Sequence, residues 1–236
     1  MIAEGKTMPV VIGADGKVIM KSNGQPQRMV YNYNEGSSTY EFQGGDVIYE
    51  DINRDGQINA LDIVYLGNSL PKLYGGFNFN FTYGRWGLRA RFFYRYGNKV
   101  INAARMALEN MSSAYNQCSS VNWRWRKDGD VTPIPRAIYV YDDASAYNYQ
   151  GSDRYVEDGS FVRFQNLQIS YSFDKKKIKK YGLTNLQFYA SMNNLFCWTR
   201  YSGVDPEKSV AGFGVATDES QTPRAKSFTA SLQIGF

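Results

Sequence analysis

The chain has 236 residues, a net charge of +5, no histidine and two cysteines, which excludes histidine-based triads, imidazole zinc sites and Cys₄ zinc sites. No run of 18 apolar residues is present, which argues against a transmembrane helix. Aromatic residues nevertheless make up 16% of the chain, while its mean hydropathy is only −0.48. This combination is typical of membrane β-strands, in which polar and apolar residues alternate.

The N-terminal part, residues 1–72, is expected to be a β-rich segment with turns at Asp15-Gly16 and Asn23-Gly24. Its strongest motif is an acidic loop at 51–62, which fits the calcium-loop pattern D-x-[DN]-x-[DN]-G with an acid at position twelve. Because Ca²⁺ prefers several oxygen ligands, the pattern predicts a site for Ca²⁺ or Mg²⁺. The predicted ligands are Asp51, Asn53, Asp55, Gln57 through its carbonyl, and Asp62.

Two features of this loop depart from an EF-hand. Position twelve is Asp62 rather than Glu, and no helix precedes the loop, so its spacing is similar to that of a dockerin. The alternative is an acidic turn that is capped by its own Asp and Asn side chains without metal. A bound ion would make this external loop rigid and would take no part in catalysis.

Five segments alternate apolar and polar residues over the length that a tilted strand needs to cross a bilayer. They are Tyr74–Tyr83, Trp86–Tyr96, Asn166–Phe173, Leu186–Asn193 and Ser227–Phe236. Gly84-Arg85 is expected to form a two-residue hairpin turn between the first two. In the second segment Arg89, Arg91 and Arg95 share one face, opposite aromatic and apolar residues. This suits water inside and lipid outside, although a soluble sandwich would give the same alternation.

The connection lengths favour the membrane interpretation. With the C-terminus in the periplasm, the links 84–85 and 174–184 are periplasmic, and the links 97–159 and 200–225 are external. Short and long links alternate in this way in outer-membrane barrels. We therefore predict an all-β fold in which 73–236 is the C-terminal segment of a large antiparallel transmembrane β-barrel. It has about five membrane strands and long external loops.

The external segment 97–159 is too long to lack structure, and a short helix is expected within 98–113. Further along, Trp123, Arg124 and Trp125 either pack within the loop or against a partner, or contact sugars. No nucleic-acid-binding motif is present, so no nucleic-acid partner is expected. The lysine-rich residues 175–180 are expected to be a solvated turn. Cys118 and Cys197 are expected to be free thiols.

Several further motifs occur in a fixed order along the chain. They are Gly45-Asp46-Val47, Gly67-Asn68-Ser69-Leu70-Pro71-Lys72, Tyr96-Gly97-Asn98, the run from Asp153 to Arg163, Asn193-Asn194-Leu195-Phe196, the run from Tyr201 to Glu207, and Pro223-Arg224. With these motifs the chain resembles, from about Gly44 to Phe236, the C-terminal part of SusC/RagA-type TonB-dependent outer-membrane transporters of Bacteroidota.

The resemblance implies a barrel of about 22 strands with a plugged lumen in a Gram-negative outer membrane. It implies import of oligosaccharides or peptides with a SusD-like surface lipoprotein, driven by TonB acting on the plug. Since this chain has no plug and few strands, the remaining plug and barrel part is expected in another chain or product. Arg89, Arg91 and Arg95 would then line the lumen, facing the plug or the substrate.

Two other functions are less consistent with the sequence. A soluble dockerin-like calcium-dependent interaction module is the main alternative, but it predicts a duplicated calcium loop and only one is present. A carbohydrate-active enzyme needs paired carboxylates that face one cleft, whereas the acidic residues here cluster in loops. The sequence therefore does not predict an enzyme.

Overall fold

The computed structural model describes residues 10–32, 39–138, 147–208 and 215–236, and it divides into two units. Unit 1 comprises Met1–Leu66 and Arg105–Ser152, and unit 2 comprises Gly67–Ala104 and Asp153–Phe236. Unit 1 thus combines the N-terminal segment with the middle of the long connection 97–159, whereas the sequence-based division has one boundary at residue 72. Among the described residues, no helix is long and apolar enough to cross a membrane.

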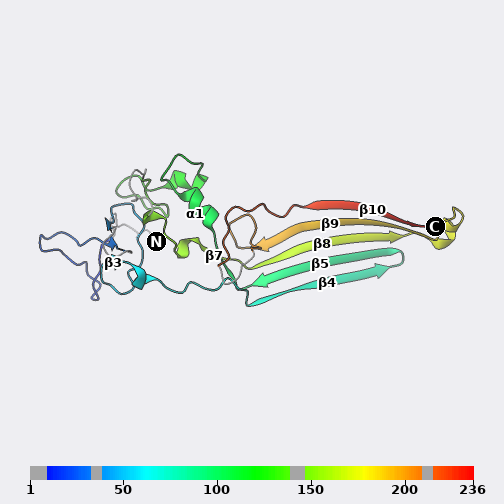
Figure 1. Ribbon diagram of the computed structural model, residues 1–236, viewed down its shortest axis with the longest axis horizontal. Helices are drawn as coiled ribbons and strands as arrows, with labels where there is room; N and C mark the ends of the chain where they lie inside the picture. The colour runs from blue at the N-terminus through cyan, green and yellow to red at the C-terminus, as the bar shows by residue number, and fades with distance from the viewer. Residues whose placement is uncertain (1–9, 33–38, 139–146, 209–214) are drawn as a thin grey trace. The chain divides into compact units, whose positions relative to one another are not determined.

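Unit 2 is built on a five-stranded antiparallel sheet in the order β10-β9-β8-β5-β4, which Figure 1 shows side by side. The strands are β4 (Leu73–Tyr83), β5 (Trp86–Tyr96), β8 (Phe161–Ser172), β9 (Asn185–Thr199) and β10 (Ser227–Gly235). The five predicted strands are confirmed. Two are longer than expected: β8 begins at Phe161, and β9 continues to Thr199.

The predicted turn at Gly84-Arg85 joins β4 to β5, and Tyr83 pairs with Trp86 across it. Gly84 has a φ of 57° while Arg85 does not have a positive φ. A positive φ at the first turn position alone is the pattern of a type II′ turn, whose twist matches that of paired antiparallel strands. This explains why glycine comes first in the pair.

The strand register separates the side chains into two faces. One row across the sheet is polar, and it consists of Asn80, Arg89, Gln168, Ser191 and Thr229. The next row is apolar, and it consists of Phe81, Leu88, Ile169, Ala190 and Ala230. Phe79 and Phe81 are 62% and 63% exposed, so the described chain does not cover the apolar face. The aromatic core that a soluble sandwich would require is therefore not present in this part of the structure.

A bulge preserves these faces near one end of β8 and β9. Phe164 pairs with Phe196 and Asn166 pairs with Asn193, so Gln165 on β8 lies opposite Asn194 and Leu195 on β9. Asn194 has a φ of 54°, a left-handed conformation that asparagine tolerates better than most residues. In a regular strand, residues three apart point to opposite faces. Because one residue of β8 lies opposite two residues of β9 at the bulge, Phe164 and Leu167 instead lie on the same apolar face.

The periplasmic-type link between β8 and β9 contains a short helix, α2 (Lys175–Lys179), where the sequence predicted only a solvated turn. The Asp174 side chain caps it by accepting a hydrogen bond from Lys176 N at 2.9 Å, and Ile178 is buried. Ile178 is the single apolar residue among these lysines, and the sequence pattern alone did not indicate that it is buried. Beyond the opposite ends of β5 and β8, β6 (Lys99–Ile101) pairs with β7 (Val156–Asp158), which follows the 3₁₀ turn η4 (Asp153–Tyr155).

Unit 1 has little regular structure. A small sheet in the order β2-β1-β3 consists of β1 (Val30–Tyr31), β2 (Tyr40–Glu41) and β3 (Gln57–Ile58). Gly16 and Gly24, each with a φ of 76°, occupy the two predicted turns. The core consists of Val11, Met29, Phe42, Ile58 and Tyr147.

Three short helices complete the described elements of the chain. They are the 3₁₀ helix η1 (Ala60–Asp62), α1 (Ala103–Glu109) and the 3₁₀ helix η2 (Ser119–Trp123). The short helix that the sequence predicts within 98–113 is confirmed as α1.

Candidate functional site

The polar face of the unit 2 sheet carries two of the predicted arginines. Arg89 Nε donates to Asn80 Oδ1 at 3.1 Å, and Arg91 Nε donates to Asn78 Oδ1 at 3.2 Å. Both partners lie directly opposite on β4 and are neutral amides. No carboxylate in the described residues pairs with either arginine, so both guanidinium charges remain available on this face.

The third predicted arginine has a different role. Arg95 Nη1 donates to the Lys208 carbonyl oxygen at 3.0 Å, and its guanidinium lies 5.7 Å from the centre of the Phe93 ring. Arg95 therefore holds the loop that follows β9. The structure thus keeps Arg89 and Arg91 together and separates Arg95 from them.

Arg163, which is not among the predicted site residues, is the centre of a buried ion-pair cluster at the same end of the sheet. Its Nη2 lies 2.6 Å from Asp205 Oδ1, and its Nε lies 3.1 Å from Glu207 Oε2. Glu207 Oε1 also pairs with Arg224 at 2.8 Å. The Arg163 side chain is only 5% exposed. Its ion pairs with Asp205 and Glu207 therefore hold the loop after β9 against β8.

A second cluster lies in the same loops. Lys208 Nζ and Asp218 Oδ1 are 2.9 Å apart, and Tyr201 donates its hydroxyl to Asp218 Oδ2 at 2.7 Å. Burial and this hydrogen bond raise the pKa of Tyr201 above its ordinary value. Burial alone would raise the pKa of Asp218, but the hydrogen bonds from Lys208 and Tyr201 hold it below its ordinary value. At neutral pH the cluster therefore has an ion pair and a neutral phenol.

Two glycine-containing motifs meet beside this region. Gly159 N donates to the Asn98 carbonyl oxygen at 2.9 Å, and Gly97 N donates to Ser160 Oγ at 2.9 Å. A Cβ on Gly159 would lie 2.4 Å from Asn98 Nδ2. The buried side chains of Asn98 and Val100 therefore occupy the space that a side chain at position 159 would need.

The acidic loop 51–62 lies in unit 1, and its side chains cap its own backbone. Asp51 accepts from Asp55 N at 3.2 Å and from Gly56 N at 2.8 Å, and Asp62 accepts from Ile52 N at 2.8 Å and Asn59 N at 2.9 Å. Gly56 has a φ of 84°, which gives the sharp turn that the motif predicts.

The remaining predicted ligands of this loop follow the same pattern. Asn53 Oδ1 accepts from Asp55 N at 3.0 Å, and Gln57 N donates to Asp55 Oδ1 at 2.7 Å. In the described part of the chain, no group of three acidic, cysteine or histidine side chains converges as a metal cluster. That criterion does not count the Asn53 side chain or the Gln57 carbonyl, which belong to the predicted donor set, so binding of Ca²⁺ or Mg²⁺ stays a prediction.

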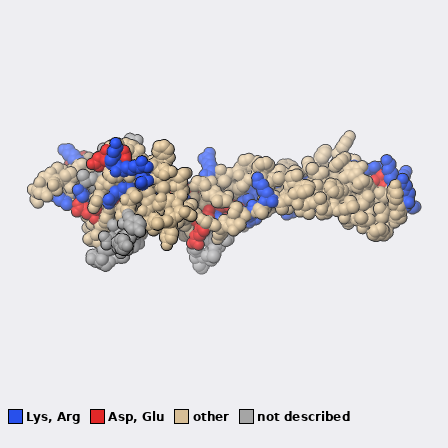
Figure 2. All heavy atoms as spheres, turned by 90° about the horizontal axis from the view of Figure 1, so that it is seen from above, with Lys and Arg blue, Asp and Glu red and all other residues tan. Residues whose placement is uncertain are grey.

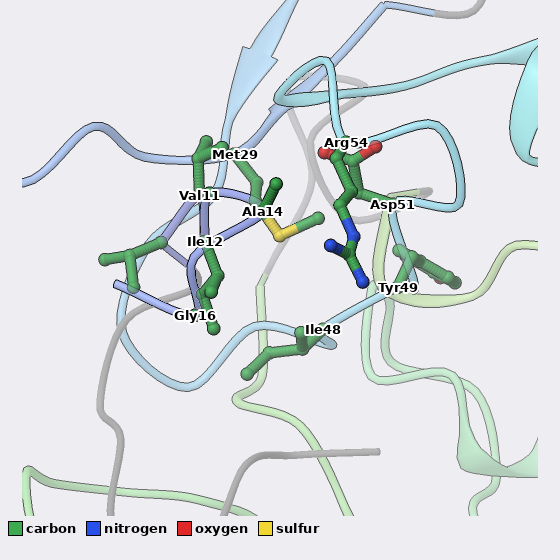
Figure 3. A pocket seen from close by; sticks show the side chains of 11 residues that line it. Val11, Ile12, Ala14, Gly16, Met29, Ile48, Tyr49, Asp51 and Arg54 are labelled. Carbon is green, nitrogen blue, oxygen red and sulfur yellow. The ribbon is translucent and has the colours of Figure 1, made fainter. Parts of the chain in front are cut away.

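The start of this loop lines a hollow of about 310 Å³ in unit 1. Figure 3 shows the apolar side chains of Val11, Ile12 and Met29 on one side of the hollow and Asp51 and Arg54 on the other. The loop therefore contributes polar atoms to a mostly apolar depression.

Unit 1 also contains a buried polar network around Asp46, from the motif Gly45-Asp46-Val47. Asp46 accepts from Arg136 Nε at 2.6 Å, from Tyr40 Oη at 2.7 Å and from Asn148 Nδ2 at 3.1 Å. Burial and the hydrogen bond to Asp46 raise the pKa of Tyr40 to about 12. The network joins segments about 100 residues apart, so it has a structural role in this unit.

The predicted Trp/Arg cluster does not form a single surface. Trp123 is 77% exposed, whereas Trp125 lies so close to Gly45 that a Cβ there would be 2.3 Å from its ring. Arg124 Nη1 donates to the Val121 carbonyl oxygen at 3.3 Å. Cys118 and Cys197 are both free, as expected.

These features define the class of protein. A strongly amphipathic antiparallel sheet has short links at one end and long links at the other, and charged clusters hold the long ones in place. This is the arrangement of a segment of an outer-membrane β-barrel.

Comparisons with known proteins agree with this class. No protein-family model matches the sequence. The chain is 30% identical over 200 residues to TonB-dependent receptor P39 of Formosa agariphila, which covers 82% of this chain and 19% of that receptor. It is 26% identical to TonB-dependent receptor P3 of the same organism, over 94% of this chain and 22% of the receptor. TonB-dependent receptor SusC of Bacteroides thetaiotaomicron is 31% identical over 36% of this chain and 8% of SusC.

Solved structures give the same result. A structure of the RagAB peptide transporter matches with a TM-score of 0.61 and 25% identity, over 72% of this chain and 18% of that chain. The RagAB peptide importer in its "open-open" state has a TM-score of 0.65 at 21% identity, over 93% of this chain and 25% of that chain, and supports the fold. The chain spans about a fifth of the length of the curated relatives that it matches first.

The chain carries a barrel segment of a SusC/RagA-type TonB-dependent transporter, as its motifs indicated. The predicted all-β fold class is likewise confirmed.

Proposed function

We propose that the chain forms part of the wall and of the external mouth of a TonB-dependent outer-membrane importer and is not an enzyme. The single observation that carries this proposal is the sheet with one polar and one apolar face, both exposed in the described residues. Exposed aromatic rows of this size are costly in water and favourable in lipid. In Figure 2 Lys and Arg gather at the sheet end that carries α2, while a band of the visible face further along the strands shows no charged atoms.

The substrate that we propose is an oligosaccharide or a peptide. A peptide as substrate is supported by the similarity to the RagAB peptide transporter. The similarity to the TonB-dependent receptor SusC supports the same class of importer. Arg89 and Arg91 support a role on the lumen side, because their charges are bound only by neutral amides. They would face either the plug or the carbonyl, carboxylate and hydroxyl groups of the substrate.

The partners that we propose are the remaining plug and barrel part, TonB acting through that part, and a SusD-like lipoprotein at the external mouth. Two observations support a missing neighbour. Strands β4 and β10 each pair with one strand only in the described sheet, and a lipid-exposed strand edge is strongly unfavourable. In unit 1 the extended residues 63–66 leave four apolar side chains exposed, among them Tyr65 at 82%.

A pair of adjacent cysteine substitutions in β10 tests the orientation of the sheet. Ser231 lies on the polar face and Ala230 on the apolar face, and both are exposed and small. In the assembled transporter, with Cys118→Ser and Cys197→Ser as background, we expect Ser231→Cys to react with a water-soluble maleimide. Ala230→Cys should react only with a lipid-soluble reagent. Equal labelling of the two positions by the water-soluble reagent would contradict the proposal.

A further inference from the structure

The apolar face ends in an open aromatic groove where β5, β8 and β9 meet the long loops. The groove has a volume of about 710 Å³, and its lining includes Tyr94, Tyr96, Val162, Trp198 and Arg200. Tyr94 pairs with Val162, and Val162 pairs with Trp198, so these side chains form one row on the apolar face. Trp198 is 54% exposed and Tyr96 is 62% exposed.

Two cations lie on the same face beside these rings. Arg200 follows Trp198 by two residues, which continues the alternation of β9, and it lines the groove. Lys226 precedes β10, and its Nζ lies 5.5 Å from the centre of the Phe196 ring, which stacks on Trp198 with ring centres 6.0 Å apart. Both cations are exposed, and neither has an ion-pair partner in the described residues.

One carboxylate also lines the groove, but it is already bound. Asp158 Oδ1 accepts hydrogen bonds from Ser160 N at 3.0 Å and from Ser160 Oγ at 2.6 Å. Burial would raise the pKa of Asp158, but these hydrogen bonds and the neighbouring cations Lys99 and Arg200 hold it below its ordinary value. The lining of the groove therefore combines aromatic rings with Arg200, while Lys226 lies outside the lining, beside Phe196 on the same face. Arg95 also belongs to the lining, but it donates to the Lys208 carbonyl oxygen, and the one carboxylate of the lining is already bound.

We propose that this groove binds the headgroup of a phosphorylated glycolipid of the outer leaflet. The proposal rests on the proposed function, since it requires the apolar face to lie in a bilayer. Acyl chains would continue along the apolar rows of the sheet, sugar rings would lie against Trp198 and Tyr96, and phosphates would pair with Arg200 and Lys226. The exposed rings of Trp198 and Tyr96 favour a headgroup that contains sugars over a simple glycerophospholipid, because aromatic rings pack against the apolar faces of sugars.

The test uses the complete transporter complex in lipid nanodiscs that contain either monophosphoryl lipid A or phosphatidylglycerol, with the bound lipid counted by native mass spectrometry. We expect wild type to retain lipid A in preference to phosphatidylglycerol. Arg200→Gln and Lys226→Gln should each lower retention of lipid A about fivefold, since each removes a cation near the membrane surface. Trp198→Leu should lower retention of lipid A and leave that of phosphatidylglycerol unchanged. Lys17→Gln, an exposed cation of unit 1, is the matched control.

Equal retention of the two lipids, or unchanged retention of lipid A in both cation variants, would overturn the inference alone. A complex that does not enter the nanodisc at all would overturn both the inference and the proposed function. The two failures are therefore distinguishable.

Discussion

Arg163 and Asp205 lie 42 residues apart in the sequence, yet Arg163 Nη2 and Asp205 Oδ1 are 2.6 Å apart and largely buried. One residue belongs to β8 and the other to the loop after β9. The pair therefore fixes the position of the long loop after β9 against the sheet. The motifs that contain Arg163 and Asp205 thus contribute to one structural contact.

Removing one partner of this pair should be costly. In Asp205→Ala the buried Arg163 guanidinium keeps only Glu207 as an anionic partner. Loss of one partner of a buried ion pair lowers the free energy of unfolding by about 3–5 kcal/mol. Because Glu207 still pairs with Arg163 in the variant, we expect a loss at the lower end of this range. Thermal and denaturant unfolding of the purified assembly would measure it. Asp128→Ala, at an exposed position, is the control, and a similar small effect of both variants would show that the pair does not stabilise the loop.

Close packing of side chains against Gly159 gives a second prediction. In Gly159→Ala the new Cβ would lie 2.4 Å from Asn98 Nδ2 and 2.6 Å from Val100 Cγ2, so these two buried side chains must move. Overpacking of this kind costs about 1–3 kcal/mol of unfolding free energy. Gly151→Ala is the matched control, because a Cβ there has nothing within 4 Å. Equal stability of the two variants would contradict the close approach.

The bulge at Asn194 gives a third prediction, which separates backbone strain from hydrogen bonding. Asn194 has a φ of 54°, and its Nδ2 donates to the Ala225 carbonyl oxygen at 2.9 Å. Asn194→Ala should lose about 1–2 kcal/mol from the left-handed conformation in addition to the hydrogen bond. Asn194→Gly loses only the hydrogen bond and its side-chain packing, so it should be the more stable variant in unfolding measurements. The reverse order would mean that the backbone strain is not important.

Period-two alternation was enough to predict the five strands, their two faces and the hairpin at Gly84-Arg85, because these follow from local geometry. The loop clusters were not predictable in the same way. Arg163 occurs in an alternating strand like any lumen-facing residue, and its partners Asp205 and Glu207 come from a distant loop. Periodicity contains no information about such pairing.

Two local features were missed for different reasons. The helix α2 depends on one cap, Asp174, and one apolar anchor, Ile178, and the surrounding lysines suggested a solvated turn. A capping residue directly before the run was the available signal. The division of Arg89 and Arg91 from Arg95 arises because β5 continues into the region covered by the loop, which alternation does not reveal.

The acidic loop gives a fourth prediction, which separates its two interpretations. If the loop binds Ca²⁺, added Ca²⁺ should raise the melting temperature, and Asp55→Asn should abolish this rise. The self-capped turn seen in the structure would instead give no response to Ca²⁺. In either case Asp62→Ala should cost about 1 kcal/mol, because Asp62 caps the backbone N–H groups of Ile52 and Asn59. Asp15→Asn is a control outside the loop.

The cluster of Lys208, Asp218 and Tyr201 gives a prediction about acid. The folded chain holds the pKa of Asp218 below its ordinary value of about 3.9, so the folded state binds the proton less tightly than the unfolded state. The stabilisation from Asp218 is therefore fully present above about pH 4 and is lost as the pH falls through the lower, folded pKa. Limited proteolysis with pepsin should detect the loosened loop 200–208 in this acidic range. Asp218→Asn removes the titrating carboxylate, so its cleavage in the loop should be faster than wild type at pH 4 and less dependent on pH below it. Wild-type cleavage that changes with pH no more than that of the variant would show that Asp218 does not control the loop.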